Sequence, residues 1–251
     1  MIEQTEKLLS SIFSCETRGL VITIIAPAGL GKTTFSCMQL PTYIYSKLKE
    51  KNELSENTRI HVVNTDLSFL EQRFSEILEE FNLSYKEIRN YLKIDFVTTM
   101  GQQETIVKQI VKFALENVNA NVPYVVVDPF NHILRMEFAK AHEDYRLNVV
   151  GRLSPKLENL LNYLSLIARK KGTTVVITML PKKRYTDRVP LVWQNAFFGP
   201  SEIAHLSDVV LWLSHGVHEK HGVTVHVLKH RLKETPYQVN CKLTKGGLVL
   251  A

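Results

Sequence analysis

The sequence predicts an α/β protein with a mainly parallel central sheet flanked by helices and with antiparallel strands added near the C-terminus. Short apolar runs alternate with amphipathic stretches as far as residue 178, which is typical of parallel strands joined by helices. After Asp208 the apolar runs follow one another with only short connectors, which favours antiparallel strands at one sheet edge. A glycine-rich turn, Ala26–Thr33, joins the first apolar run to the first helix.

Length and composition fit one globular domain that spans residues 1–251. Hydrophobic residues make up 45% of the chain and charged residues 22%, which excludes general disorder because both values are ordinary for globular proteins. The 31 lysines and arginines exceed the 25 acids, and this balance permits a polyanionic partner without requiring one. Three widely spaced cysteines do not suggest a disulfide framework, so we expect a reducing, cytoplasmic environment.

No segment has the pattern of a secretion signal or of a membrane span. Met1–Lys7 carries acids where a signal peptide has bases followed by an apolar block. The longest apolar stretch, Leu20–Leu30, is interrupted by Thr23, Pro27 and Gly29 and is too short to cross a bilayer. We therefore expect no membrane association.

The strands of the parallel part are predicted from runs rich in β-branched residues. Val21–Ile25 and Tyr124–Val127 are almost wholly apolar, as expected for strands that are covered on both faces. The complete set of runs lies at residues 21–25, 61–64, 94–97, 124–127 and 174–178. Helices are predicted between them from Lys32 onward and over residues 69–81, 84–91 and 104–118, with Ser84 as a helix cap.

The clearest helix precedes the fifth strand. Ser154 and Pro155 form a cap and first-turn pair, and Lys170-Lys171-Gly172 is typical of a helix end. Leucine and isoleucine recur between these signals at helical spacing, at positions 157, 160, 161, 164 and 167. The charged stretch before it, residues 135–146, is expected to form a solvated helix or a loop.

Four further strands are predicted in the last part of the chain, at residues 209–213, 223–228, 237–243 and 248–250. Their connectors, residues 216–222, 234–236 and 245–247, are short and carry glycine or proline. No internal repeat or long linker separates them from the rest, so the prediction remains a single domain.

The turn after the first strand has the spacing of a P-loop, Ala26-Pro-Ala-Gly-Leu-Gly-Lys-Thr. In such a loop, consecutive backbone N–H groups and the helix N-terminus bind phosphates. Lys32 would reach the outer phosphates of ATP, and the Thr33 hydroxyl would bind Mg²⁺. Ala26 replaces the first glycine of the usual pattern. The loop residues predicted to contact the nucleotide are Ala28, Gly29, Leu30, Gly31, Lys32, Thr33 and Thr34.

Two carboxylates complete the predicted site. Asp128 directly follows the strand at 124–127 and would hold the Mg²⁺ shell through a water, the alternative being a turn before Pro129. Asp66 follows the second strand and would act with Lys32 in catalysis by orienting the attacking water. The alternative for Asp66 is a helix cap.

These residues resemble a known family, the archaeal RadA-type recombinases and especially their short RadB-like paralogues, over nearly the whole chain. Asn64-Thr65-Asp66 followed by Glu71-Gln-Arg-Phe74 is similar to the family's Asp-Thr-Glu motif and its downstream Glu-Arg-Phe. Thr5–Ser11, Ala204–Asp208 and Lys229–Arg231 are similar to further family segments. The resemblance implies a RecA-like P-loop ATPase core.

The resemblance also implies ligands and partners. ATP with Mg²⁺ would control binding to single-stranded DNA, with Thr33 and Asp128 serving the metal. Asp66 would stand where the family has its catalytic glutamate. Arg73 would lie against the adenine face, a role that suits a planar guanidinium, and the alternative is a solvated helix residue. A RadA-type recombinase would be the protein partner.

Several positions depart from the family pattern. Asp66 is one methylene shorter than glutamate, so we expect it to hold the water poorly. In the family the strand matching residues 174–178 ends in Asn-Gln, and the Gln senses the γ-phosphate. Met179 and Leu180 stand at these positions and cannot make that polar contact. The chain has no room for the family's N-terminal helical domain and no Phe-x-x-Ala segment in its first 20 residues, which predicts an accessory protein rather than a filament-forming recombinase.

The stretch after the fifth strand, Pro181–Gly199, resembles the family's DNA-binding loop in position. Its chemistry favours the same role, because cations suit phosphates and aromatic rings stack on bases. The residues predicted to bind DNA are Lys182, Lys183, Arg184, Tyr185, Arg188 and Trp193. The alternatives are a solvated basic turn for the cations and core packing for Trp193, Phe197 and Phe198.

Two late clusters carry weaker signals. Lys229-His230-Arg231 could contact DNA or a neighbouring subunit's phosphate, but solvated surface is the favoured interpretation. His218 and His221 lie at a turn without an accompanying set of Cys or acidic ligands, so no metal site is predicted there.

The hypothesis from the sequence is an ATP-binding, weakly hydrolysing RecA/RadA-like paralogue that binds single-stranded DNA. It would be an accessory or modulator in homologous recombination and DNA repair. One alternative is an ATP-dependent regulatory or scaffolding protein whose basic loop contacts a protein. A small-molecule kinase is disfavoured because no arginine-rich lid is evident.

Overall fold

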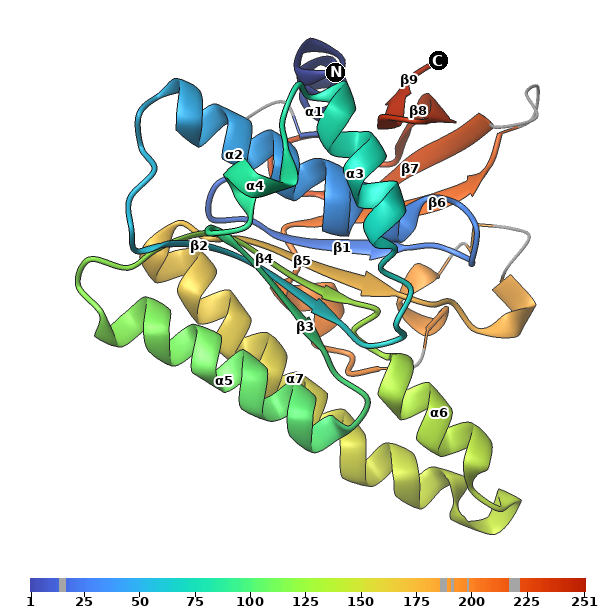
Figure 1. The fold of residues 1–251 in the computed structure, drawn as a ribbon. Helices are drawn as coiled ribbons and strands as arrows, with labels where there is room; N and C mark the ends of the chain where they lie inside the picture. Colours follow the sequence, from blue (N-terminus) through green and yellow to red (C-terminus); the bar gives the residue numbers. More distant parts are fainter. Residues whose placement is uncertain (14–16, 186–188, 191, 198, 217–221) are drawn as a thin grey trace.

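The computed structural model describes residues 1–13, 17–185, 189–190, 192–197, 199–216 and 222–251. The described residues form one nine-stranded sheet in the order β3-β2-β4-β5-β1-β6-β7-β8-β9. Neighbouring strands from β3 to β6 are parallel, and those from β6 to β9 are antiparallel (Figure 1). The predicted α/β class, with flanking helices and antiparallel C-terminal strands, is therefore confirmed.

Among the predicted parallel strands, β1 has the expected bounds, and β2, β4 and β5 extend beyond theirs by up to three residues at either end. β3 begins two residues earlier than predicted and ends one residue earlier. The strands are β1 Val21–Ile25, β2 Thr58–Asn64, β3 Leu92–Phe96, β4 Asn121–Asp128, β5 Thr174–Met179, β6 Val209–His215, β7 Gly222–His230, β8 Tyr237–Thr244 and β9 Gly247–Leu250. The helices are α1 Ile2–Phe13, α2 Leu40–Glu50, α3 Glu71–Glu80, α4 Tyr85–Ile88, α5 Met100–Glu116, α6 His132–Lys140, α7 Arg146–Lys171 and α8 Ile203–Leu206.

The sheet separates two hydrophobic cores. Helices α1 to α4 cover one face and α5 to α7 the other (Figure 1). Alternate residues of β1 serve the two cores, because successive side chains of a strand point to opposite faces. Ile22 and Ile24 join the first core, and Val21 and Ile25 join the second.

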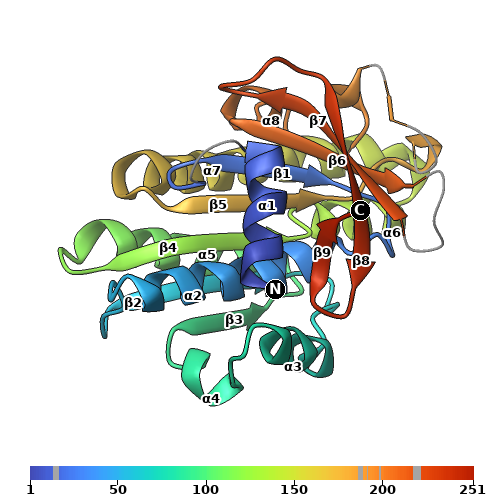
Figure 2. The same ribbon diagram turned by 90° about the horizontal axis from the view of Figure 1, so that it is seen from above.

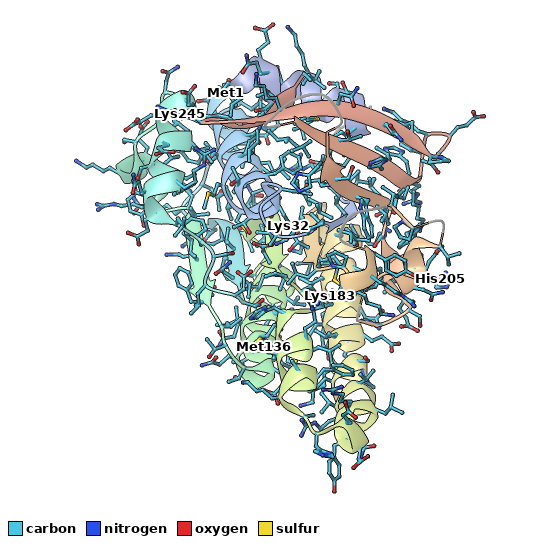
Figure 3. All side chains as sticks on the ribbon, turned by 90° about the vertical axis from the view of Figure 1, so that its right-hand side faces the viewer. Met1, Lys32, Met136, Lys183, His205 and Lys245 are labelled. Carbon is cyan, nitrogen blue, oxygen red and sulfur yellow. The ribbon has the colours of Figure 1, made fainter. Side chains whose placement is uncertain are left out.

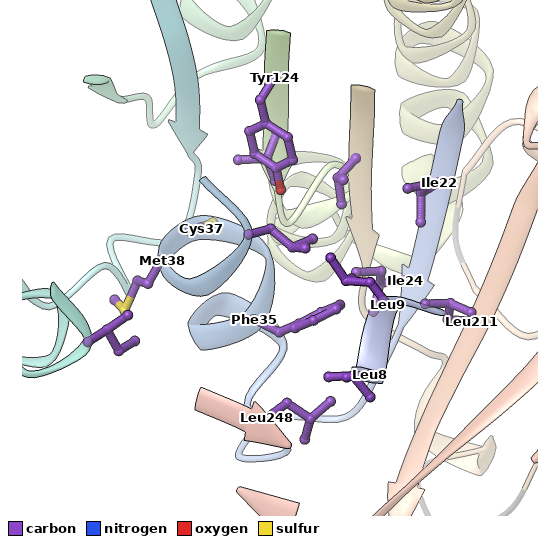
Figure 4. Packing of buried hydrophobic residues seen from close by; sticks show 14 of the residues in the cluster. Leu8, Leu9, Ile22, Ile24, Phe35, Cys37, Met38, Tyr124, Leu211 and Leu248 are labelled. Atoms are coloured by element: carbon purple, nitrogen blue, oxygen red, sulfur yellow. The ribbon is translucent and has the colours of Figure 1, made fainter. Parts of the chain in front are cut away.

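In the first core, α1 lies across the sheet, with its N-terminus close to β9 (Figure 2). The turn of helix before α2 contributes Phe35, which packs near Leu8 of α1, Ile24 of β1 and Leu248 of β9, and Met38, which points away from these residues (Figure 4). The first and last elements of the chain thus pack around the helix that follows the glycine-rich turn.

The parallel strands bring the ends of β1, β4 and β5 to one edge of the sheet. β5 lies between β4 and β1, and its last residue, Met179, is level with Ile25 of β1. On its other side Ile177 is level with Val127 of β4. The connections that leave these three strands therefore meet at the carboxyl edge, where ligands bind in open α/β sheets.

The predicted start of the long helix is wrong. Helix α7 begins at Arg146, and Pro155 lies inside it rather than in its first turn. Proline removes one helical hydrogen bond, but the preceding turns bury Leu153 on the same face as Leu157 and pack against α6. This burial offsets the lost bond, so the helix continues towards its N-terminus through the proline.

Local capping signals explain where two other helices begin. Ser84 caps α4 as predicted, in a capping box with Glu87. Helix α5 begins four residues before the predicted position because Thr99 and Gln102 form a second capping box. Helix α1 was not among the predicted elements, and α6 covers the first part of residues 135–146, for which a solvated helix or a loop was expected. Within the described chain, no helix has both the length and the apolar character needed to cross a membrane.

Candidate functional site

The glycine-rich turn leaves β1 at the carboxyl edge and has backbone geometry that suits an anion. Gly29 and Gly31 have φ angles of +86° and +76°, a region that side chains disfavour. A Cβ at Gly31 would also lie 2.8 Å from the Leu243 Cδ1 atom of β8. Among the described residues, none accepts a hydrogen bond from the N–H groups of Ala28, Gly29, Leu30 or Gly31. Four such donors in one turn fit a phosphate group.

The helix after the turn starts at Lys32, as predicted, but its first turns are irregular. Thr34–Gln39 is π-helical and leads directly into α2. Pro41 accounts for the widening, because it lacks an N–H group and its ring crowds the carbonyl of Cys37 four residues earlier. Such π-helical turns are frequent at functional sites.

Asp128, the last residue of β4, is the hub of the site. Its Oδ1 atom accepts a hydrogen bond from Lys32 Nζ at 2.7 Å, and its Oδ2 atom accepts one from Thr33 Oγ1 at 2.6 Å. The Thr178 hydroxyl of β5 donates to Oδ1, and the Cys37 thiol donates to Oδ2 at 3.4 Å. Four donors, from β5 and from the helix that follows the glycine-rich turn, therefore converge on one carboxylate that is 0% exposed.

Burial and ion pairing shift the pKa of the Asp128 carboxylate in opposite directions. Burial alone would raise the pKa of Asp128, but the Lys32 charge and the hydrogen bonds outweigh it and hold the pKa below its usual value. Lys32 is only 6% exposed, so the ion pair is removed from water. The Cys37 thiol, also buried, has a pKa raised well above its usual value by burial and then by the Asp128 charge.

The donor set fits a magnesium nucleotide. The Thr33 hydroxyl gives its proton to Asp128, so the lone pairs of its oxygen remain available to a cation. No group of three His, Cys, Asp or Glu side chains capable of holding a metal occurs in the described part of the chain. A Mg²⁺ ion here would therefore depend on Thr33, water and phosphate oxygens, as nucleotide-bound Mg²⁺ commonly does.

Asp66 lies beside this hub, in the turn after β2. Its Oδ1 atom accepts hydrogen bonds from the Ser68 N–H at 3.1 Å and from Asn64 Nδ2 at 3.3 Å. Its Oδ2 atom accepts none from the described residues. Asp66 does not cap α3, since Leu70 holds the cap position. The Ser68 and Thr33 hydroxyl oxygens are 3.3 Å apart, so the turn touches the helix of the glycine-rich loop.

Arg73 of α3 holds the C-terminal hairpin rather than standing in solvent. Its guanidinium donates to the Thr244 carbonyl and pairs with Glu76 at 2.8 Å. The neighbouring residue Leu243 is the one that packs over Gly31. Arg73 therefore lies one contact away from the glycine-rich turn, on the side covered by the β8–β9 hairpin.

The predicted DNA-binding residues separate into exposed and buried ones. Lys183 and Arg184 are exposed, and Lys183 lies on the side of the molecule that carries Lys32 (Figure 3). Lys182 is half-buried, and burial followed by the Arg184 charge lowers its pKa. The Arg184 guanidinium lies 4.7 Å from the centre of the Tyr185 ring. Arg188 and Phe198 lie outside the described residues.

Trp193 does not offer a face for a nucleic acid base. Its side chain is 8% exposed, belongs to the second core and stacks on Phe197 with ring centres 6.5 Å apart. The expectation of base stacking by Trp193 is therefore replaced by its alternative, core packing. Burial of this large apolar ring outweighs the polar character of the stretch around it.

In the cluster Lys229-His230-Arg231, the expectation of solvated surface holds for Arg231, which is exposed, but is wrong for Lys229 and His230, which are structural. Lys229 donates to the carbonyls of Ala204, His205 and Ser207. The His230 ring contacts the Phe13 carbonyl at 3.1 Å, and Arg231 pairs with Asp208 at 3.4 Å. His218 and His221 lie outside the described residues.

Several residues of the site were not singled out from the sequence. Thr178, Ser68 and Cys37 reach Asp128, Asp66 or Thr33 directly. His132, the first residue of α6, is half-buried, and burial lowers its pKa while the nearby Asp66 charge opposes the shift. Thr178 did carry a signal, because it is a polar residue that ends an apolar strand.

Comparison of the chain with protein-family models gave no match, and a search of curated proteins found no significant relative. The function of the chain is therefore inferred from the residues of the site and from the resemblance in sequence.

Proposed function

We propose that the chain is a RecA-like P-loop domain that binds ATP with Mg²⁺ and hydrolyses it weakly. One observation carries the proposal. Lys32 and Thr33, at the start of a helix, meet Asp128, at the end of a separate strand, in one buried cluster. This cluster lies beside four backbone N–H groups that no described residue satisfies. Phosphate and a phosphate-bound cation are the ligands that use both halves of such a site.

The roles of the side chains follow from their chemistry. Lys32 would bind the outer phosphates, and Thr33 would bind the metal directly with Asp128 acting through water. Mg²⁺ would neutralise charge that develops on the phosphates. Asp66 presents one carboxylate oxygen free of described donors and would orient the attacking water. The Asp66 side chain is one methylene shorter than glutamate and would hold the water poorly, so slow ATP turnover is expected.

The second part of the proposal concerns single-stranded DNA. Lys182, Lys183 and Arg184 follow β5, so they lie at the same sheet edge as the glycine-rich turn. Clustered cations at this edge suit the phosphates of a nucleic acid. Together with the resemblance in sequence, this placement supports an accessory or modulating role beside a RadA-type recombinase in recombination and repair.

The DNA proposal is tested by fluorescence anisotropy of a labelled single strand, titrated with protein at several salt concentrations with and without ATP·Mg²⁺. Lys183→Ala/Arg184→Ala is the test variant. Lys170→Ala/Lys171→Ala is the matched control, because it removes two exposed cations at the far end of α7. Only the test variant should weaken binding, and it should make the slope of log affinity against log salt shallower by about 1.4 units, or about 0.7 for each cation removed.

A second candidate function is a regulatory or scaffolding ATPase whose basic segment binds an acidic protein. The burial of Trp193 favours this candidate, because a buried ring cannot stack on a base. Tyr185, the described aromatic residue next to the cations, has its ring covered by Arg184. The same titration separates the two candidates. ATP binding without any DNA binding at low salt would rule out the DNA proposal and leave this one.

A further inference from the structure

Leu180, two residues before the basic segment Lys182–Arg184, is held by the buried side-chain amide of Asn131, in the connection that follows Asp128. Asn131 lies three residues after Asp128 and is 0% exposed. Its Nδ2 group donates to the Leu180 carbonyl at 3.1 Å, and its Oδ1 atom accepts from the Leu180 N–H at 3.0 Å. The amide thus pairs with both backbone groups of Leu180, as a neighbouring strand would.

A second pair of contacts joins the same two segments one step earlier. The Thr178 hydroxyl donates to Asp128 Oδ1, and the Phe130 N–H donates to the Thr178 carbonyl at 2.7 Å. The glycine-rich turn is attached as well, since the Ala26 N–H donates to the Met179 carbonyl at 3.2 Å. The last residues of β5 are therefore tied on one side to Asp128 and on the other to the turn.

The basic segment begins within this network. Lys182 follows Leu180 by two residues, and its N–H donates to the Ala196 carbonyl at 2.6 Å. Pro181 forms a bridge with Phe197, whose ring stacks on Trp193. A displacement of Leu180 is therefore transmitted to Lys182 and to the surroundings of the Trp193 ring.

We propose that Asn131 is a positioning residue that transmits the occupancy of the Asp128 site to the basic segment. The inference rests on the proposed function, because it requires a nucleotide at that site. Phosphates and Mg²⁺ provide new partners for Lys32 and Thr33, which changes the balance of donors on Asp128. The Thr178 hydroxyl also donates to that carboxylate, so a movement of Asp128 displaces the end of β5. The two hydrogen bonds between Asn131 and Leu180 make the backbone of Leu180 move with the Asp128 connection. The Leu180 side chain is apolar, so this backbone link supplies the connection to the phosphate site.

Trp193 provides a readout that does not depend on DNA. The chain has two tryptophans, and Trp212→Phe leaves Trp193 as the single reporter. Trp212 is buried, and its Nε1 atom has no hydrogen-bond partner in the described part of the chain, so phenylalanine removes no described bond there. In this background, ATP·Mg²⁺ should change the emission of Trp193, and Asn131→Ala should abolish the change while nucleotide affinity stays within about twofold.

Gln103→Ala is the matched control. Gln103 is also a buried amide, and it donates to the Phe130 carbonyl at 3.3 Å, on the same connection but without a hydrogen bond to the described residues of β5. It should lower stability as Asn131→Ala does and yet retain the change in Trp193 emission. If both variants lose the change, Asn131 has only a structural role and the inference is wrong.

Single-strand affinity measured with and without ATP·Mg²⁺ gives the second readout. For the parent protein we expect the affinities with and without ATP·Mg²⁺ to differ by a ratio of about fivefold or more, and for Asn131→Ala we expect them to be nearly equal. If the parent binds ATP and DNA but shows neither a ratio nor an emission change, the inference fails and the proposed function stands. If the parent binds no ATP, the proposed function fails.

A folding defect in Asn131→Ala would not leave the inference untested. Thr178→Val has nearly the same shape as the parent residue and removes the hydroxyl contact to Asp128. It breaks the same connection at the preceding step, so it should also reduce the emission change and the affinity ratio. Full retention of both by this folded variant would overturn the inference.

Discussion

The glycine-rich turn and the basic segment leave the same sheet edge after the neighbouring strands β1 and β5, but they hold their charges differently. Lys32 is 6% exposed and pairs with a carboxylate that is 0% exposed. Lys183 and Arg184 are exposed. A charge taken out of water needs a partner, whereas an exposed charge keeps its hydration. Substitutions at the first site should therefore affect both folding and binding, and those at the second should affect binding alone.

The largest effect is expected from Asp128→Ala. This change leaves the Lys32 ammonium buried without its partner, so we expect a loss of about 3–5 kcal/mol in the free energy of unfolding. Chemical denaturation measures it. Lys32→Met/Asp128→Ala should lose less than the single variant, because the unpaired charge is gone. A double variant that loses more would show that the pair is not the source of the effect.

A smaller effect is expected from His61, a half-buried residue whose buried ring nitrogens have no hydrogen-bond partner among the described residues. Burial, with Arg59 and Lys93 adding to it, lowers the His61 pKa from 6.5 to about 4. The folded state thus disfavours the protonated ring. This contribution to stability is complete above the unfolded-state pKa of 6.5 and is lost as the pH falls from 6.5 towards 4.

Acidification from pH 7 to pH 5 should lower the free energy of unfolding by about 2 kcal/mol through His61 alone. Denaturant titrations of the parent and of His61→Val at both pH values isolate it. The variant should lose about 2 kcal/mol less than the parent on acidification. Equal losses would mean that other groups cause the acid sensitivity.

The smallest effect on stability is expected from Arg184→Ala. The side chain is exposed and its described contact is the Tyr185 ring, so the free energy of unfolding should change by less than about 0.5 kcal/mol. DNA affinity should nevertheless fall, if the proposed function holds. A loss of stability comparable with that of Asp128→Ala would remove the contrast between the two sites.

Much of the fold could be predicted because its signals are local. β-Branched runs defined the parallel strands, and the Ser84–Glu87 pair defined the start of α4. The start of α7 could not be predicted in the same way. Ser154 and Pro155 have the local pattern of a helix start, and only the packing of α6 against the preceding turns shows otherwise.

The candidate site shows the same division. The spacing of Lys32 and Thr33 is local, and the position of Asp128 at a strand end was visible in the sequence. The contribution of Thr178 depends on β5 lying between β4 and β1, which is a property of the sheet order. The burial of Trp193 depends on tertiary packing, which composition alone does not reveal.

Gln39 gives the site a dependence on the order in which the chain is synthesised. This buried amide of the π-helical turn donates to the Leu248 carbonyl at 2.8 Å and accepts from the Leu248 N–H at 2.7 Å, 209 positions along the chain. A nascent chain that has not yet reached β9 therefore contains the whole glycine-rich turn but lacks these two hydrogen bonds. Each bond of this kind contributes about 0.5–1.5 kcal/mol, so the helix that supports the turn gains this stabilisation only after the last strand emerges from the ribosome.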